Sequence, residues 1–271
     1  GTTEIAWGNE PLEADMNRAI DMIAKIPTMI AADFRYRNKK RRIPPRADLS
    51  IAENFFHMCF GKVPSKPVVK AFDVSLILYA EHSFNASTFA SRVITSTRSD
   101  IYSAVVGGIG ALKGPLHGGA NEAVMEMMKK IKTPKNAESW IRRAMLNKEL
   151  IMGFGHRVYK NGDSRVPTMK KCLEDLTQWS GEDKWLGIYN ILADIFINEK
   201  GIYPNLDFPS GPAYYLMGFP INLYTPIFVM ARVAGWSAHF IEQNANNSLI
   251  RPLSSYTGKS QRKVGKISER K

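Results

Sequence analysis

The most informative part of the sequence is the stretch GPLHGGAN at residues 114–121. It places His117 on a glycine-rich turn directly before a good helix former, residues 120–131. Glycine lets the backbone approach a ligand closely, and the unpaired N–H groups of a helix start favour negative charge and disfavour protonation of a nearby imidazole. A neutral His117 is therefore suited to donate a hydrogen bond to an oxygen that gains charge during a reaction.

Two further turns between helical segments carry side chains of the same kind. His156 lies in GFGHR at residues 153–157, and Asp207 lies in PNLDFPSG at residues 204–211. A single histidine on a glycine turn is as often a cap or turn residue as a catalytic one. Two histidines and one aspartate, each at a tight turn, together form a candidate acid/base set.

The spacing of apolar residues predicts an all-α fold, because no alternating stretch persists as a strand. A capping box at Ser50–Glu53 and a glycine stop at Gly61 bound one helix, Pro27 should kink or end the first, and Asn136 should cap another. The predicted helices cover residues 12–26, 28–35, 51–60, 65–81, 85–96, 100–112, 120–131, 137–147, 167–178, 184–200 and 223–243.

The charge and helix length of the sequence change along the chain. The segment 121–218 is more charged and has shorter helices than its flanks, which indicates a smaller helical domain inserted into a larger one. We expect residues 1–120 and 219–257 to form the large domain and residues 258–271 to form a basic disordered tail. The active site is then expected in the cleft between the two domains.

The chain of 271 residues carries a formal charge of +12, concentrated in two basic blocks at residues 35–42 and 259–271. Such runs are most often a solvated loop and a tail. Nucleic-acid binding is the alternative, but no recognition-helix, zinc-finger or ribonucleoprotein pattern accompanies the charge. We favour an electrostatic field that steers a polyanionic small molecule, such as a nucleotide-bearing thioester.

The two cysteines, Cys59 and Cys172, lie in apolar or helical settings and are interpreted as core thiols. This usage fits a reducing compartment, and no signal peptide or membrane span is recognised, so we expect a cytoplasmic protein.

Several motifs, in order along nearly the whole chain, resemble those of the citrate synthase family. They are EHSFNAS at 81–87, GPLHGGAN at 114–121, GFGHRVYK at 153–160, GDSR at 162–165, NLD at 205–207, ARVAGW at 231–236 and IRP at 250–252. Within the family, DFPSGPAYY at 207–215 and GWSAHFIEQ at 235–243 are most similar to bacterial 2-methylcitrate synthases. The family pattern has a further N-terminal part, so we expect the chain to be a fragment or a shortened relative.

The resemblance implies a two-domain helical fold and the condensation of an acyl-CoA with oxaloacetate, followed by hydrolysis of the thioester. By position, Asp207 would remove a proton from the carbon next to the thioester carbonyl, and His117 would stabilise the enol at its oxygen. His156 would polarise the oxaloacetate carbonyl. A thioester α-proton is so weakly acidic that a lone carboxylate cannot remove it efficiently without a hydrogen-bond donor at the developing oxyanion. Each such donor typically stabilises the oxyanion by about 2.7–4 kcal/mol.

The resemblance also implies the groups that hold carboxylates of oxaloacetate and product: His82, Arg165, Arg232 and Arg251. Guanidinium binds carboxylate in a two-pronged fork and keeps its charge. Arg232 lies in an apolar helix and needs an anionic partner, for which an internal Asp or Glu is the alternative. Arg251 would reach the active site of a neighbouring subunit, which makes a homodimer part of the prediction. His57 and His239 are interpreted as packing or hydrogen-bonded core residues.

Coenzyme A is expected as part of a co-substrate, and no metal or permanently bound cofactor is required. The segment at 150–154 resembles the family's backbone contact with the adenine end, and two lysines stand where basic side chains meet phosphates, although either could be a solvated helix-end charge. The candidate residues are Leu150, Ile151, Met152, Gly153, Phe154, Lys160 and Lys200.

Three functions follow from the sequence. The first is a synthase that condenses propionyl-CoA with oxaloacetate and water to give 2-methylcitrate and free CoA, with acetyl-CoA also giving citrate. The second is a citrate synthase that prefers acetyl-CoA. The two acyl groups differ by one methyl group, which a pocket can discriminate by only about 1–3 kcal/mol. The third is a non-catalytic helical domain that binds CoA or a protein partner. A basic helical module on nucleic acid ranks last.

Overall fold

The computed structural model describes residues 12–155, 158–159 and 161–270, and the regular secondary structure in this part of the chain is helical. Its one β pairing within those ranges is an isolated antiparallel bridge between Phe154 and Pro204. The predicted all-α class is confirmed. The α-helices are α1 (Leu12–Arg37), α2 (Ile51–Phe60), α3 (Lys66–Ala80), α4 (Ala86–Ser96), α5 (Ile101–Leu112), α6 (Ala120–Ile131), α7 (Pro134–Leu146), α8 (Val166–Ser180), α9 (Lys184–Lys200), α10 (Asp207–Leu216) and α11 (Tyr224–Ala245), with short 3₁₀ turns η1 (Ile221–Leu223) and η2 (Ile267–Glu269).

Local capping explains several helix starts. The Ser50–Glu53 capping box is formed in both directions at the start of α2, and Gly61 ends that helix in the left-handed conformation at φ 80°. Asn85 caps α4 by accepting a hydrogen bond from the backbone N–H of Thr88 at 3.0 Å. These side chains satisfy N–H groups that a helix start leaves unpaired.

Two predicted helix boundaries are wrong. Pro27 does not end the first helix, because α1 continues as one helix through that position and buries the ring. Helix α7 begins at Pro134 and is not capped by Asn136, which lies inside the helix and donates its side-chain N–H to the carbonyl of Ile131 at 2.9 Å. Proline is favoured at the first helical position because its missing N–H would be unpaired there anyway.

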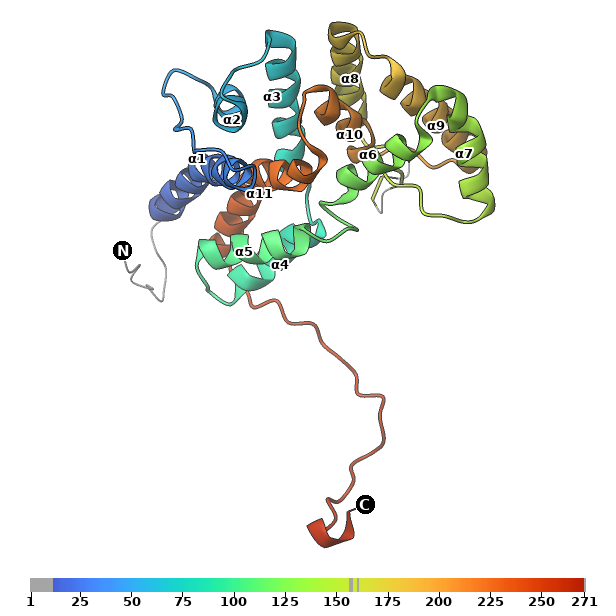
Figure 1. The fold of residues 1–271 in the computed structure, drawn as a ribbon. Coiled ribbons are helices and arrows are strands. Elements are labelled where there is room, and N and C mark those ends of the chain that lie inside the picture. The colour runs from blue at the N-terminus through green and yellow to red at the C-terminus, as the bar shows by residue number, and fades with distance from the viewer. Residues whose placement is uncertain (1–11, 156–157, 160, 271) are drawn as a thin grey trace.

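Helix α11 lies at the centre of a group formed with α1, α3, α4 and α5 (Figure 1). Helices α6 to α10 pack chiefly against one another and lie to one side of this group, joined to it by contacts of α3 with α8 and of α6 with α11. A helix that is apolar around most of its circumference must be covered on most sides, as α11 is up to Ser237. The division into a large domain and an inserted domain at 121–218 stays a prediction.

Aromatic rings fill the core where α2 and α3 meet the turn after α10. Phe56 stacks on Phe219 with ring centroids 4.7 Å apart, and Phe72 lies 4.9 Å from the same ring. Such offset and tilted pairs add to the free energy gained from burial. They fix the end of α10, whose start carries Asp207.

Beyond α11 the chain leaves the helical body as an exposed, extended segment (Figure 1). The expected disorder of residues 258–271 stays a prediction. In the described ranges, no helix by itself has the length and apolar composition to cross a bilayer, and α10 with the η1–α11 unit meets that test only as a pair bent by 120°.

Candidate active site

A cavity of about 410 Å³ lies where the end of α3, the turn before α6, the start of α10 and the middle of α11 meet. Five of the residues predicted from the sequence line it, although they come from segments far apart along the chain. These are His82, His117, Arg165, Asp207 and Arg232.

Asp207 is the first residue of α10 and is held in place by two neighbours. The hydroxyl of Tyr79 donates a hydrogen bond to its carboxylate at 2.6 Å, and its own backbone N–H donates to the side chain of Asn205 at 3.1 Å. Burial raises the pKa of Asp207 to about 6, against the opposing effects of the Tyr79 hydrogen bond and of the charges on Arg165 and Arg232. The carboxylate is thus a stronger base than an ordinary one while still ionised at neutral pH.

His117 lies on a tight turn that glycine makes possible. The N–H of Gly118 donates to the carbonyl of Leu112 at 2.7 Å, and a side chain at Gly118 would collide with that leucine. Burial, and then the charge on Arg232, lower the pKa of His117 to about 4. The imidazole is therefore neutral at pH 7, as the sequence predicts, with burial as the main cause.

Ser87 and Asn85 hold Nε2 of His117 in a hydrogen-bonded cluster. The Ser87 hydroxyl lies 2.8 Å from Nε2 of His117 and donates to Asn85 Oδ1 at 2.7 Å, while Trp236 donates its indole N–H to the same hydroxyl oxygen at 3.1 Å. Asn85 Oδ1 also lies 3.2 Å from Nε2, and the Ser87 oxygen keeps one lone pair beside the Trp236 bond, so Nε2 can donate to this cluster or accept from Ser87. If the Ser87 hydroxyl turns from Asn85 to donate to Nε2, the proton of the neutral imidazole lies on Nδ1.

Arg232 supplies a buried cation to the cavity. Its side chain is 1% exposed, its Nε donates to the carbonyl of Tyr79 at 2.7 Å, and its guanidinium lies 4.8 Å from the centre of the Phe228 ring. Within the described part of the chain it forms no ion pair, and one terminal nitrogen has no hydrogen-bond partner. Burial lowers the pKa of Arg232 to about 10, so it stays charged at neutral pH. An unpaired donor beside a cavity is suited to an anionic ligand.

The hydrogen-bond donors of Arg165, unlike those of Arg232, are largely used within the protein itself. It forms a two-pronged pair with buried Asp163, from Nε at 3.0 Å and from a terminal nitrogen at 2.7 Å, and also donates to the carbonyl of Leu78 at 3.3 Å. Burial alone would raise the pKa of Asp163, but the hydrogen bonds and charge of Arg165 lower it overall. Arg165 therefore lines the cavity as half of a fixed ion pair.

The remaining predicted residues are less closely gathered. The ring of His82 lies edge to face with Tyr159, with centroids 5.2 Å apart. Arg251 is exposed in the segment after α11 and Lys200 is exposed at the end of α9, and neither lines the cavity. His156 and Lys160 lie outside the described residues.

The segment at residues 150–154 is fixed against the turn that carries Asp207. The carbonyl of Gly153 accepts a hydrogen bond from the N–H of Asn205 at 2.9 Å. Gly153 has φ 84°, and a Cβ there would lie 2.8 Å from that of Phe208, so glycine is required. Ile151 is buried, Leu150 is exposed, and Met152 and Phe154 pack partly against the core.

Three polar residues of the site are not among the residues predicted to act in it. Tyr79 lies in an apolar helical run, where a tyrosine is indistinguishable from a core residue by its spacing. Asn85 and Ser87 lie in the helix predicted at residues 85–96 with no role in the site expected for them, and the structure shows that they contact His117. The sequence signal for them is their position beside His82 in the EHSFNAS motif.

Comparison with known proteins gives the family. The sequence pattern described as "Citrate synthase, C-terminal domain" matches residues 3–253. The chain is 55% identical to a citrate synthase of Mycolicibacterium smegmatis over 97% of its own length and 70% of that protein. It is 59% identical to a 2-methylcitrate synthase of Mycobacterium tuberculosis over 92% of its own length and 63% of that protein.

Comparison with solved structures gives the same family. Citrate synthase from Thermotoga maritima superimposes with a TM-score of 0.87 at 41% identity, covering 96% of this chain and 72% of that one. A ternary complex of citrate synthase from Thermoplasma acidophilum with carboxymethyl coenzyme A and oxaloacetate gives a TM-score of 0.90 at 39% identity, covering 99% and 72%. The fold is thus of the all-helical citrate synthase type. The chain belongs to the citrate synthase family, which confirms the resemblance seen in the sequence, and it spans 63–70% of the length of the curated relatives named above.

Proposed function

We propose that this protein condenses an acyl-CoA with oxaloacetate and water, giving 2-methylcitrate from propionyl-CoA or citrate from acetyl-CoA, together with free CoA. The observation that carries the proposal is the pairing, in one cavity, of a carboxylate with a raised pKa and a histidine kept neutral, Asp207 and His117. The solved relative from Thermoplasma acidophilum, which binds a CoA analogue and oxaloacetate, supports the choice of substrates.

The first step is the removal of a proton from the carbon next to the thioester carbonyl. Asp207 takes this proton, and the electron pair of the broken C–H bond moves to the carbonyl oxygen. His117 donates a hydrogen bond to that oxygen from Nδ1, while the Ser87 hydroxyl, 2.8 Å from Nε2, turns to donate to that nitrogen. A neutral imidazole N–H is a weak acid and so is the better match for the strongly basic enolate oxygen, and burial makes its hydrogen bond stronger than it would be in water.

The enol carbon then attacks the carbonyl of oxaloacetate, which His156 polarises, and water hydrolyses the resulting thioester. Arg232, Arg165 and His82 hold carboxylates of oxaloacetate and product. The free donor of Arg232 and its burial support this role, because a buried charge gains most from an anionic partner.

Coenzyme A would lie along the segment 150–154, with Lys160 and Lys200 near its phosphates. We further propose a homodimer in which Arg251 completes the site of the partner subunit, a two-domain arrangement with the cavity in the cleft, and a cytoplasmic location. The dimer and the two-domain arrangement rest on the family resemblance, and the location rests on the two buried thiols, Cys59 and Cys172.

Both acyl substrates remain in the proposal, with propionyl-CoA preferred. Relatives of similar identity carry the names citrate synthase and 2-methylcitrate synthase. A pocket separates substrates that differ by one methyl group by only about 1–3 kcal/mol. Citrate synthase with a preference for acetyl-CoA is therefore the second candidate.

The test is thiol release from propionyl-CoA and acetyl-CoA, with and without oxaloacetate. We expect release that depends on oxaloacetate, is faster with propionyl-CoA and is lost in Asp207→Asn, while exposed Asp194→Asn behaves as wild type. A clear preference for acetyl-CoA would leave the reaction in place and replace the substrate. No release from a folded sample would contradict catalysis by this chain, and CoA binding would then test a non-catalytic role.

A further inference from the structure

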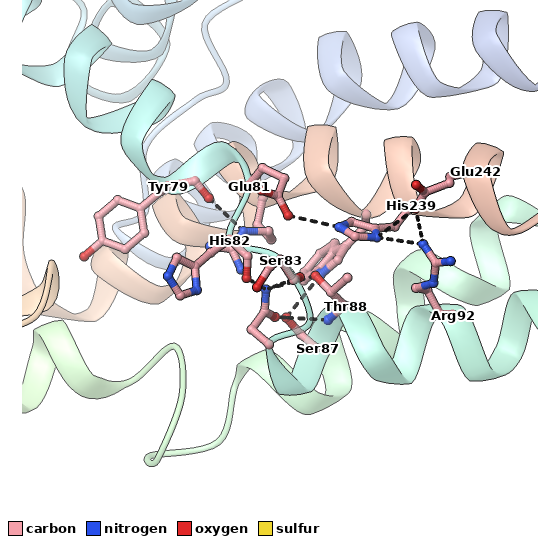
Figure 2. Close-up of polar contacts among 12 residues, drawn as sticks. Tyr79, Glu81, His82, Ser83, Ser87, Thr88, Arg92, His239 and Glu242 are labelled. Atoms are coloured by element: carbon pink, nitrogen blue, oxygen red, sulfur yellow. Dashed lines mark hydrogen bonds and ion pairs between the residues drawn. The ribbon is translucent and has the colours of Figure 1, made fainter. Parts of the chain in front are cut away.

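A second set of charged side chains lies behind the loop that carries His82, away from the cavity. It joins three elements: Glu81 at the end of α3, Arg92 on α4, and His239 and Glu242 on α11. Figure 2 shows Arg92 bonded to both His239 and Glu242, with Glu81 on the opposite side of the imidazole ring. Arg92 and His239 are each only 12% exposed at the side chain, so this is a partly buried network and no ordinary surface pair.

The contacts of His239 determine which of its nitrogens carries the proton. A terminal nitrogen of Arg92 lies 2.9 Å from Nδ1 of His239. Guanidinium only donates hydrogen bonds, so Nδ1 must accept. The proton is therefore on Nε2, which donates to the carboxylate of Glu81 at 3.0 Å. His239 thus links Arg92 through hydrogen bonds to Glu81, the residue directly before His82.

The loop between α3 and α4, residues 81–85, is held by this network at two points. Besides Glu81, the ring of Phe84 lies under the guanidinium of Arg92 at 4.8 Å and edge to face with His239 at 5.6 Å. Between these points Ser83 has φ 41°, a backbone conformation that residues other than glycine keep only when their surroundings hold it. The same loop places His82 and Asn85 in the cavity wall.

Arg92 also reaches the segment that leads to Arg251. Its Nε donates to Oε1 of Gln243 at 3.1 Å, and the side-chain N–H of Gln243 donates to Asn247 at 3.0 Å. Asn247 in turn donates to the carbonyl of Ser96 at the end of α4 at 3.0 Å. One guanidinium thereby connects two segments that carry proposed oxaloacetate ligands.

We propose that Arg92 and His239 are positioning residues for the oxaloacetate site, holding the loop 81–85 and the segment 247–250 in the arrangement that binds the dicarboxylate. The proposal rests on the proposed function for the identity of the ligand. Neither side chain lines the cavity, so both act through the residues they hold. Because the contacts proposed to bind the CoA part lie on other segments, the effect of losing the network on substrate affinity falls on oxaloacetate.

The test uses oxaloacetate binding, measured by titration calorimetry, together with the KM values for oxaloacetate and for acyl-CoA. The variants are Arg92→Met, His239→Leu and His239→Gln, whose amide can both accept from Arg92 and donate to Glu81. Arg142→Met is the matched control, because Arg142 also links side chains of two helices, Glu138 on α7 and Glu199 on α9, but away from the cavity.

We expect Arg92→Met and His239→Leu to weaken oxaloacetate binding about tenfold, with the KM for acyl-CoA within about twofold of wild type. His239→Gln should restore most of the affinity, and Arg142→Met should match wild type. Unchanged oxaloacetate binding in both Arg92→Met and His239→Leu would overturn the proposal. Equal changes in both KM values, with a lowered Tm and no rescue by glutamine, would also overturn it, because they indicate a general loss of structure.

Two outcomes separate this inference from the proposed function. If the wild-type chain binds oxaloacetate but releases no thiol, the proposed function fails, and the binding comparison still decides the role of the network. If the wild-type chain binds no oxaloacetate, the inference is overturned. Glu81→Ala, which removes only one exposed carboxylate, replaces Arg92→Met if that variant does not fold, with the same expected loss of binding.

Discussion

The hydrogen bond from Tyr79 to Asp207 sets how strong a base the carboxylate is. This bond stabilises the ionised form, so it lowers a pKa that burial alone would raise further. In Tyr79→Phe we expect the pKa of Asp207 to rise above about 6 by roughly one unit. The base must be ionised, so activity falls as the pH falls through this pKa, and the acid limb of kcat/KM moves to higher pH in the variant.

The measurement is the profile of kcat/KM against pH, from about pH 5 to pH 9, for wild type and Tyr79→Phe. The control is Tyr189→Phe, at a buried tyrosine on α9 that does not contact Asp207. An acid limb that stays in place in Tyr79→Phe would show that this bond does not control the base.

Arg232 makes a contrasting prediction, because its buried charge is costly to the fold and has no ion-pair partner among the described residues, so that a ligand would supply one. Replacing it in Arg232→Met removes a buried cation without an ion-pair partner in the described chain, so we expect little loss of Tm. The variant also loses the hydrogen-bonded ion pair that Arg232 is proposed to form with a carboxylate of oxaloacetate, so the affinity for oxaloacetate should fall by about 10- to 100-fold. Thermal unfolding and calorimetry measure the two effects separately, and a large fall in Tm with unchanged affinity would contradict the proposed role.

At the residue scale, the sequence identifies groups that lie at turns and carry unusual side chains for their place. His117 and Asp207 are found because a polar residue stands at a glycine or proline turn, and Arg232 because a charge interrupts an apolar helix. Tyr79 is not identified in this way, because the packing of the helices decides which face of its helix meets the Asp207 carboxylate. The pKa values also depend on burial, and the depth of burial cannot be read from the spacing of residues in the sequence.

Among the elements, the crossing of α3 and α11 determines where the loop 81–85 begins. Gly235 lies at this crossing, and a Cβ there would overlap the carbonyl oxygen of Ala80 and lie 3.3 Å from Cα of Glu81. In Gly235→Ala we expect a loss of about 1–3 kcal/mol and weaker oxaloacetate binding, because the two helices must move apart. Gly110→Ala is the control: a Cβ at Gly110, also inside a helix, meets nothing within 4 Å, so helix propensity should leave it neutral or stabilising. Equal Tm values for the two variants would contradict this account.

Helix ends are predictable from the sequence where a side chain alone determines them. The capping box at Ser50–Glu53 and the stop at Gly61 are such cases, and both are confirmed. The ends are not predictable where packing or competing signals decide, as at Pro27, which α1 accommodates while packed against α2 and α11. At α7 two capping signals stand close together, and proline at the first helical position prevails over Asn136.

At the scale of the whole molecule, the proposed homodimer would bring Arg251 of one subunit into the site of the other. If Arg251 acts in the partner's site, Asp207→Asn and Arg251→Leu should each be inactive alone but complement each other when subunits are mixed. Random exchange makes half of the dimers mixed, and one of the two sites in each mixed dimer then has both native residues, so about a quarter of wild-type activity should return. Thiol release after mixing and after exchange under mild denaturant measures this. If Arg251 instead acts within its own chain, every mixed dimer keeps one defect per site, and mixing restores nothing.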